Sequence, residues 1–117
     1  LLNPQFLLLN SFGGVLFHKL QAELYLQKQL NLDYTIIRPG GLRSESVTYP
    51  ILYGAADTFS RGSISRVQVA DVVVSASYSP QASNKIVEVI SSKKAKSIPA
   101  EQGFENIDSF AKKISSY

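Results

Sequence analysis

Two short patterns in the chain contain residues that could contact a ligand. In Lys19-Leu20-Gln21-Ala22-Glu23 a lysine precedes a glutamate by four residues, which on a helix favours an exposed ion pair worth only tenths of a kcal/mol. Pro39-Gly40-Gly41 follows a β-branched run, and glycine, which has no Cβ, allows the backbone to approach a ligand closely. The same residues also serve as an ordinary strand terminator. Each pattern alone therefore fits both a binding role and a structural role.

The composition excludes several other kinds of active site. The 117 residues contain no Cys, which excludes thiolate nucleophiles, disulfides and Cys-based zinc sites. His18 is the only His, so a metal site would need carboxylates to complete it, and no motif supports a Ser-His-Asp triad. We therefore expect no metal site in this chain.

Charge and hydropathy favour a soluble globular chain. It is 44% hydrophobic and 18% charged, with a net charge of +3 and a mean hydropathy of +0.01. The basic residues cluster only at Lys93, Lys94 and Lys96, so we expect a solvated loop there and no nucleic-acid partner. The apolar opening is too short and too interrupted for a transmembrane segment. The absence of Met predicts that something was removed before Leu1.

Periodicity predicts the elements that must position the two patterns. From Val15 to Leu30 the chain has no Gly or Pro, and its leucines recur at helical spacing in two rows, which predicts a helix buried on more than one side. Tyr34–Arg38 is rich in β-branched and aromatic residues and predicts a strand that ends at Pro39. The stretch 42–62 has no sustained period, so we expect a long loop with at most a short hairpin.

The second half of the chain continues the alternation of strand and helix. A Ser-x-x-Gln capping box at 65–68 predicts a helix over residues 66–78. Residues 85–90 predict a second strand, and the polar residues 91–103 predict a loop. A last helix is expected from Phe104 onward, because the apolar residues that follow share one helical face.

The order of these elements predicts an α/β fold. Strands separated by helices favour parallel βαβ units, in which helices cover both faces of the sheet. Two strands are too few for such a sheet, since both edges would stay open. We therefore expect the chain to be part of a larger sheet whose other strands lie upstream, and to be poorly stable by itself.

Three motifs in this order resemble one known family. They are Lys19-Leu20-Gln21-Ala22-Glu23, Tyr34-Thr35-Ile36-Ile37-Arg38-Pro39-Gly40-Gly41-Leu42, and Ser63-Ile64-Ser65-Arg66 with Val69-Ala70 just after it. Together they resemble the C-terminal half of the atypical short-chain dehydrogenase/reductases, the NAD(P)-binding, NmrA-like group of plants, algae and cyanobacteria. The resemblance covers Asn3 to about Ile90.

The resemblance implies a fold and a cofactor. The fold is a doubly wound parallel Rossmann sheet with helices on both faces, of which residues 1–117 would be the C-terminal half, without the N-terminal nucleotide-binding half. The cofactor is NADP or NAD, with NADP slightly preferred. Lys19 matches the lysine of the Tyr-x-x-x-Lys motif, which binds the nicotinamide ribose and lowers the pKa of the catalytic Tyr. Pro39, Gly40, Gly41 and Leu42 match the loop whose backbone approaches the nicotinamide.

The chain departs from the family pattern at the position of the catalytic Tyr. Four residues before Lys19, one turn earlier on the helix, stands Val15. A Val cannot donate a proton to a carbonyl group, so the standard reductase mechanism is in doubt even if the dinucleotide binds. Any proton would come from water, the substrate or an upstream residue. Whether the protein is an enzyme therefore stays open.

Three functions remain open at this point. The leading one is an NAD(P)-binding protein that acts as an oxidoreductase on an unknown small molecule, with the stretch 43–60, including Tyr49 and Tyr53, on the substrate side. The alternatives are a non-enzymatic Rossmann-like subunit or scaffold of a larger assembly, and a sensor of the cofactor's redox state. The helix Val15–Leu30 is a candidate contact for protein partners or a homodimer. The resemblance suggests a plastid or cytoplasmic location.

Overall fold

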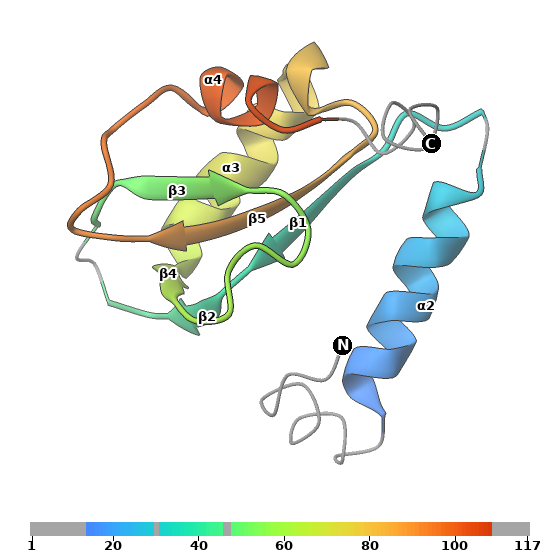
Figure 1. Ribbon diagram of the computed structural model, residues 1–117, viewed down its shortest axis with the longest axis horizontal. Helices are drawn as coiled ribbons and strands as arrows, with labels where there is room; N and C mark the ends of the chain where they lie inside the picture. The colour runs from blue at the N-terminus through green and yellow to red at the C-terminus, as the bar shows by residue number, and fades with distance from the viewer. Residues whose placement is uncertain (1–13, 30, 46–47, 109–117) are drawn as a thin grey trace. The chain divides into compact units, whose positions relative to one another are not determined.

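The first unit of the chain contains one helix. A computed structural model describes residues 14–29, 31–45 and 48–108, and the chain divides into two units after Tyr34 (Figure 1). Helix α2 spans Val15–Gln27, begins after Gly14 in the left-handed conformation (φ 70°), and ends at Lys28. The helical state of this segment is confirmed, although the helix ends before Leu30, which lies outside the described residues. The expected burial on more than one side is not seen, since Phe17, Leu24 and Tyr25 are exposed.

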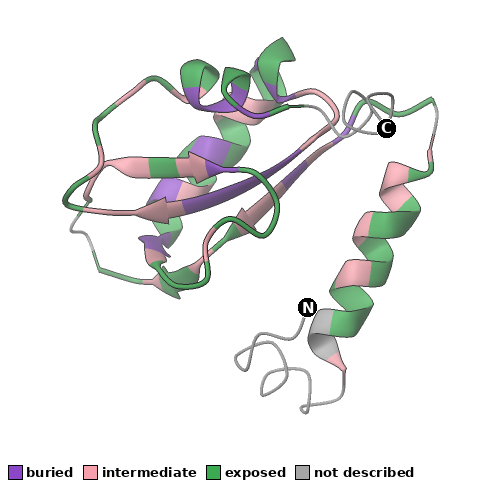
Figure 2. Ribbon diagram, in the orientation of Figure 1, coloured by how far each residue is buried: buried purple, intermediate pink, exposed green. Residues whose placement is uncertain are grey.

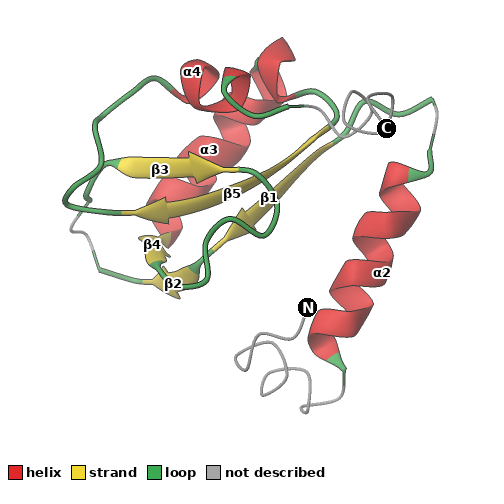
Figure 3. Cartoon of the chain, in the orientation of Figure 1, coloured by secondary structure: helices red, strands yellow, loops and turns green. Residues whose placement is uncertain are grey.

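The second unit is built on a five-stranded sheet. Its strands run in the order β1-β5-β4-β2, and β3 also pairs with β5 (Figure 3). The bounds are β1 Thr35–Pro39, β2 Gly41–Arg43, β3 Ile51–Gly54, β4 Ser63–Ser65 and β5 Lys85–Ser91. β5, the longest strand, is therefore the centre to which three other strands attach.

The two strands predicted from β-branched runs pair as expected. β1 and β5 are parallel, with Ile37 opposite Val87 and Pro39 opposite Val89. A parallel pair needs a crossover connection, and this one contains helix α3, Arg66–Tyr78. The predicted α/β arrangement is confirmed by this pair.

The prediction of a long loop over residues 42–62 was wrong. This stretch contains β3 and most of β2, and β4 follows it directly. β2 runs parallel to β4, whereas β3 runs antiparallel to β5. Strands of three or four residues are too short to show a period of two, and their pairing partners are distant in sequence. The expectation of only two strands was wrong for the same reason.

Helix α3 begins at the predicted capping box. The Ser65 side chain accepts a hydrogen bond from the Gln68 N–H at 3.1 Å, and the Gln68 side chain accepts one from the Ser65 N–H at 3.4 Å. Both partners are buried, so these donors would have no water to replace the bond. The predicted helix 66–78 is confirmed at both ends. A short 3₁₀ turn, Pro80–Ala82, then leads into β5.

The core lies on the face of the sheet that carries Val87 and Val89. These two side chains are fully buried and cluster with Ile64, Val72 of α3 and Phe104 (Figure 2). Because side chains alternate along a strand, Ile86, Glu88 and Ile90 lie on the opposite face of β5. The helices of this unit therefore pack against one face of the sheet.

Helix α4 differs from the predicted C-terminal helix. It spans Ala100–Glu105, so it begins inside the stretch predicted as a loop. A Cβ on Gly103 would lie 2.4 Å from the Tyr53 ring, so glycine allows α4 to approach β3. Phe104 and Ile107 are buried in the core as their apolar pattern suggested. The rest of the predicted helix, from residue 109 onward, lies outside the described residues.

Candidate functional site

The segment Pro39–Leu42 lies at the carboxyl end of β1, as predicted. Pro39, Gly41 and Leu42 are exposed, and the Gly41 N–H donates to the Gly62 carbonyl at 3.0 Å. In open parallel sheets, ligands bind outside the carboxyl ends of the strands. The exposed backbone of this segment is thus located where such a fold binds its ligand.

Gly40 has a packing role that the sequence did not reveal. A Cβ at this position would lie 2.6 Å from the Gly62 carbonyl oxygen and 2.9 Å from Cγ2 of Ile90. A Cβ on Gly41 would meet only ordinary contacts, the nearest at 3.6 Å. The need for glycine at Gly40 is therefore explained by the close approach of two backbone segments, and Gly41 is the glycine whose surroundings have room.

Lys19 is an exposed residue of α2. The neighbouring His18 ring nitrogen lies 3.3 Å from the Gln21 side-chain oxygen, so that single histidine has a local structural partner. α2 and the sheet are separate units, so Lys19 and Pro39–Leu42 are each described within their own unit.

Glu88, a buried carboxylate that the sequence analysis did not single out, lies on the face of β5 opposite Val87 and Val89. Glu88 accepts hydrogen bonds from three consecutive backbone N–H groups, those of Asp57, Thr58 and Phe59, at 2.6, 3.1 and 2.9 Å. Asp57 has a φ of 61°, which turns these donors toward one point. The Arg38 guanidinium lies 3.7 Å from Glu88 and 3.4 Å from Asp57. We call this set, Arg38, Asp57, Thr58, Phe59 and Glu88, the Glu88 lock.

The Glu88 lock holds the loop between β3 and β4 against the sheet. Glu88 is 9% exposed, and hydrogen bonds to a buried carboxylate are stronger than those between neutral groups. The sequence did contain a signal, because Glu88 is the one charged residue in the run Ile86-Val87-Glu88-Val89-Ile90. A single carboxylate within a buried strand needs donors, and the lock provides them.

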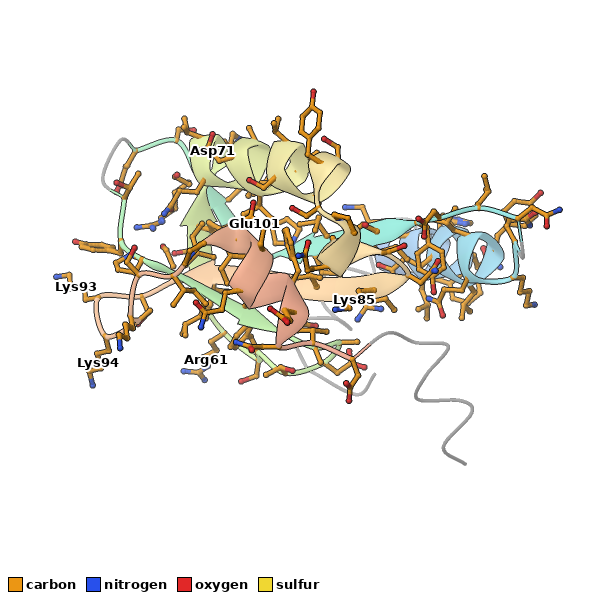
Figure 4. The ribbon with its side chains drawn as sticks, turned by 90° about the horizontal axis from the view of Figure 1, so that it is seen from above. Arg61, Asp71, Lys85, Lys93, Lys94 and Glu101 are labelled. Carbon is orange, nitrogen blue, oxygen red and sulfur yellow. The ribbon has the colours of Figure 1, made fainter. Side chains whose placement is uncertain are left out.

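A second group of polar contacts surrounds the N-terminus of α3. The Gln68 side-chain amide donates to the Tyr49 carbonyl at 2.6 Å, and the Lys93 ammonium lies 5.2 Å from the centroid of the Tyr49 ring. Arg66 is exposed and donates to the Ser44 hydroxyl at 2.7 Å. These contacts bring together the stretch before β3, the start of α3 and the loop after β5. Figure 4 labels Lys93 on that loop.

Tyr53 is the other tyrosine that was expected on the substrate side. Its ring packs edge to face with Phe104, with the centroids 5.7 Å apart. Burial raises the pKa of the Tyr53 hydroxyl above its ordinary value, and the charge of Glu101 raises it further. Both causes favour the neutral form of the Tyr53 hydroxyl over its phenolate.

At the carboxyl end of β5, a hydrogen-bond chain joins three strands. Arg43 donates through Nη2 to the Ser91 hydroxyl at 2.7 Å, and that hydroxyl donates to the Ser63 carbonyl at 3.1 Å. The Nε of Arg43 is buried and has no partner within the described residues. This chain gives the short strands β2 and β4 a connection to β5 beyond their backbone pairing.

Within residues 14–29, 31–45 and 48–108, no three His, Asp or Glu side chains gather as they would around a metal ion. In the same part of the chain, each helix is too short or too polar to cross a membrane.

Comparison with known proteins identifies the family. A family model described as NAD(P)H-binding matches residues 3–80, a range that contains both Lys19 and Pro39–Leu42. An uncharacterised chloroplastic protein of Arabidopsis thaliana is 46% identical over 90 residues, which are 77% of this chain and 32% of that protein. Protein TIC 62, chloroplastic, of the same plant is 36% identical over 107 residues, which are 87% of this chain and 16% of that protein.

A solved structure agrees with the sequence relatives. The oxidoreductase ylbE from Lactococcus lactis is 32% identical, with a TM-score of 0.58, over 73% of this chain and 36% of that chain. The chain thus spans about a third, or less, of the length of the proteins it matches. Because the family model covers well over half of the chain, the protein belongs to the NAD(P)H-binding family, in its atypical short-chain dehydrogenase/reductase, NmrA-like group.

Proposed function

We propose that this chain is the C-terminal half of a single Rossmann domain that binds NADP or NAD through Lys19 and Pro39–Leu42. Lys19 binds the nicotinamide ribose through its ammonium group. The backbone of Pro39, Gly41 and Leu42 lies against the nicotinamide, and Gly40 keeps that backbone in place by packing on Gly62. The preference for NADP over NAD rests on the family resemblance alone.

One observation supports this proposal most strongly. The carboxyl end of β1, paired in parallel with β5, leads directly into an exposed segment that has space beside Gly41. The family model spans this segment and Lys19 together. A lysine ammonium suits the hydroxyls of a ribose, and an exposed backbone suits a carboxamide.

The proposed activity is that of an oxidoreductase. The cofactor supplies the hydride when it is bound, and the residues of this chain bind and orient it. Val15 stands where the family places its proton donor, so the proton comes from water, the substrate or another part of the protein. The structural neighbour from Lactococcus lactis is an oxidoreductase, which favours this activity.

The same Val favours a second candidate function. Without the Tyr, the domain can keep its fold and its cofactor while serving as a scaffold, or as a sensor that binds oxidised and reduced cofactor with different affinity. In this case the second apolar row of α2, which contains Ala22 and Leu26, contacts a protein partner or a second copy of the chain. The chloroplastic relatives favour a plastid location for either function.

An NADPH fluorescence titration of the full-length gene product tests the proposal. Lys19→Ala should weaken NADPH binding about ten-fold or more, because a charged hydrogen-bond donor is lost. Lys28→Ala, which removes another exposed lysine of the same helical region, should leave binding unchanged. Equal affinities of the two variants would contradict the role of Lys19. Absence of NADPH binding together with an intact assembly would favour the scaffold.

A further inference from the structure

A shallow cavity opens between β3, α3 and the loop before α4. Its volume is about 300 Å³, at the small end of the range for sites that bind small molecules. The residues that line it are Thr48, Tyr49, Pro50, Ile51, Tyr53, Gln68, Ser97 and Ile98. Two aromatic rings and three aliphatic side chains give it flat, apolar walls.

The cavity lies at the same edge of the sheet as the proposed cofactor segment. Ile51, in its wall, pairs with Ser91 at the carboxyl end of β5, and Pro39 pairs with Val89 on the other side of that strand. Two strand spacings correspond to roughly 10 Å. The cavity and the segment Pro39–Leu42 thus adjoin the same end of β5, on either side of that strand.

The cavity has hydroxyl groups that the protein does not use. The side-chain hydroxyls of Thr48, Tyr49, Tyr53 and Ser97 form no hydrogen bond within the described residues. Gln68, by contrast, is fully engaged, since it completes the capping box and donates to the Tyr49 carbonyl. The wall is therefore fixed by Gln68, while the hydroxyls remain available to a ligand.

Charge at the rim of the cavity favours an anion. The Lys93 ammonium lies 5.2 Å from the centroid of the Tyr49 ring, and Gln68, in the first turn of the 13-residue helix α3, is part of the cavity wall. Glu101 is the acidic group that acts on the cavity, through Tyr53 on the opposite side. Figure 4 shows Lys93 and Glu101 on different elements, the loop after β5 and α4.

We propose that this cavity is the substrate site, and that its substrate is a flat aromatic compound with a carboxylate or similar anionic group. The ring lies against Tyr49, Ile51 and Tyr53, and the anion lies at Lys93. The free hydroxyls bind polar substituents of the ring. This inference rests on the proposed function, because a cofactor at Pro39–Leu42 is what makes a neighbouring ligand a substrate.

The test compares two probes of equal shape on the full-length gene product. 2-Naphthoate carries the anionic group, and 2-naphthamide replaces it with a neutral amide. Isothermal titration calorimetry should show tighter binding of naphthoate, and Lys93→Gln should weaken that binding about five-fold, in a salt-dependent manner. Lys94→Gln is the matched control, because Lys94 is the next residue and, among the described residues, the ammonium held over the Tyr49 ring is that of Lys93.

A second variant tests the location, and the NADPH titration separates the two proposals. Ser97→Trp, which fills the cavity from an exposed position, should abolish naphthoate binding. Equal binding of the two probes, or equal effects of Lys93→Gln and Lys94→Gln, would overturn the proposed substrate class. If NADPH binds and naphthoate does not, the substrate site is wrong while the proposed function stands. Naphthoate binding without NADPH binding would refute the role of the cavity as a substrate site.

Discussion

On one face of β5, the Glu88 carboxylate accepts hydrogen bonds from three consecutive backbone N–H groups. On the other face, the hydroxyls of Tyr49 and Tyr53 donate to no acceptor within the described residues. Both regions adjoin the same strand, since Glu88 is the middle residue of β5 and Tyr53 pairs with the next residue, Val89. In the Glu88 lock, the three backbone N–H groups of Asp57, Thr58 and Phe59 all have the Glu88 carboxylate as their acceptor. Around the cavity, the Gln68 side chain fixes the backbone of Tyr49, whereas the hydroxyls of Tyr49 and Tyr53 stay available. The comparison separates polar groups that stabilise the fold from polar groups that are available to a ligand.

Removal of the lock should produce the largest effect on stability. Glu88→Gln places an amide NH₂ opposite backbone donors and removes the charge beside Arg38. We expect a loss of about 3 kcal/mol in the free energy of unfolding, because buried donors lose a charged acceptor. Urea denaturation of the full-length gene product measures this loss. Glu105→Gln, on the exposed side of α4, is the control, and equal losses for both variants would show that the lock is not structural.

The two glycines at the end of β1 give the next largest effect. Gly40→Ala forces a Cβ to within 2.6 Å of the Gly62 carbonyl, so it should destabilise the fold by about 2 kcal/mol. Gly41→Ala meets only ordinary contacts and should change stability by less than about 0.5 kcal/mol. Under the proposed function, Gly41→Ala should instead weaken NADPH binding. Thermal unfolding and NADPH titration of both variants check this division, which fails if Gly41→Ala is the less stable of the two.

Loss of the helix cap should have a smaller effect on stability. Ser65→Ala removes the acceptor of the Gln68 N–H and should destabilise the protein by about 1 kcal/mol. It also loosens Gln68, which holds the Tyr49 carbonyl, so naphthoate binding should weaken as well. Ser77→Ala, at an exposed hydroxyl near the other end of α3, serves as the control in the same urea titrations. A stability of Ser65→Ala that matches Ser77→Ala would contradict the role of the cap.

The smallest effect concerns the pH dependence of stability. The pKa of Tyr53 in the folded protein is raised above its ordinary value of 10.0, first by burial and then by Glu101. The folded state therefore holds this proton more tightly, and its contribution to stability is present below pH 10 and lost as the pH rises above it. Stability should fall above about pH 10 more steeply in the wild type than in Tyr53→Phe. Tyr78→Phe, at an 84% exposed position, should keep the wild-type slope, and identical slopes for both variants would refute the assignment.

Local signals in the sequence predicted the longer elements. The capping box at Ser65 set the start of α3, and the β-branched runs of β1 and β5 were long enough to be recognised. β2 and β3 were missed because they have three and four residues and form only by pairing with distant strands. α4 was misplaced because its start at Ala100 depends on the contact between Gly103 and Tyr53, which no periodicity reports.

The candidate site was predicted unevenly for a related reason. The position of Pro39–Leu42 at a strand end followed from the β-branched run before it. The packing role of Gly40 did not, because Gly62 and Ile90 are distant in sequence. Glu88 and Gln68 acquire their partners only when loops fold back over the sheet, so their types were visible in the sequence and their contacts were not.

β1 ends the order of strands in the described sheet, with β5 on one side only. Its other edge therefore presents a row of backbone donors and acceptors, flanked by the apolar side chains Ile36 and Ile37. Such an edge can accept a further strand from any chain that offers one, including another copy of itself. A preparation of these 117 residues alone is thus expected to associate with itself or to aggregate as its concentration rises. A polypeptide that supplies a strand of its own beside β1 should not associate through this edge.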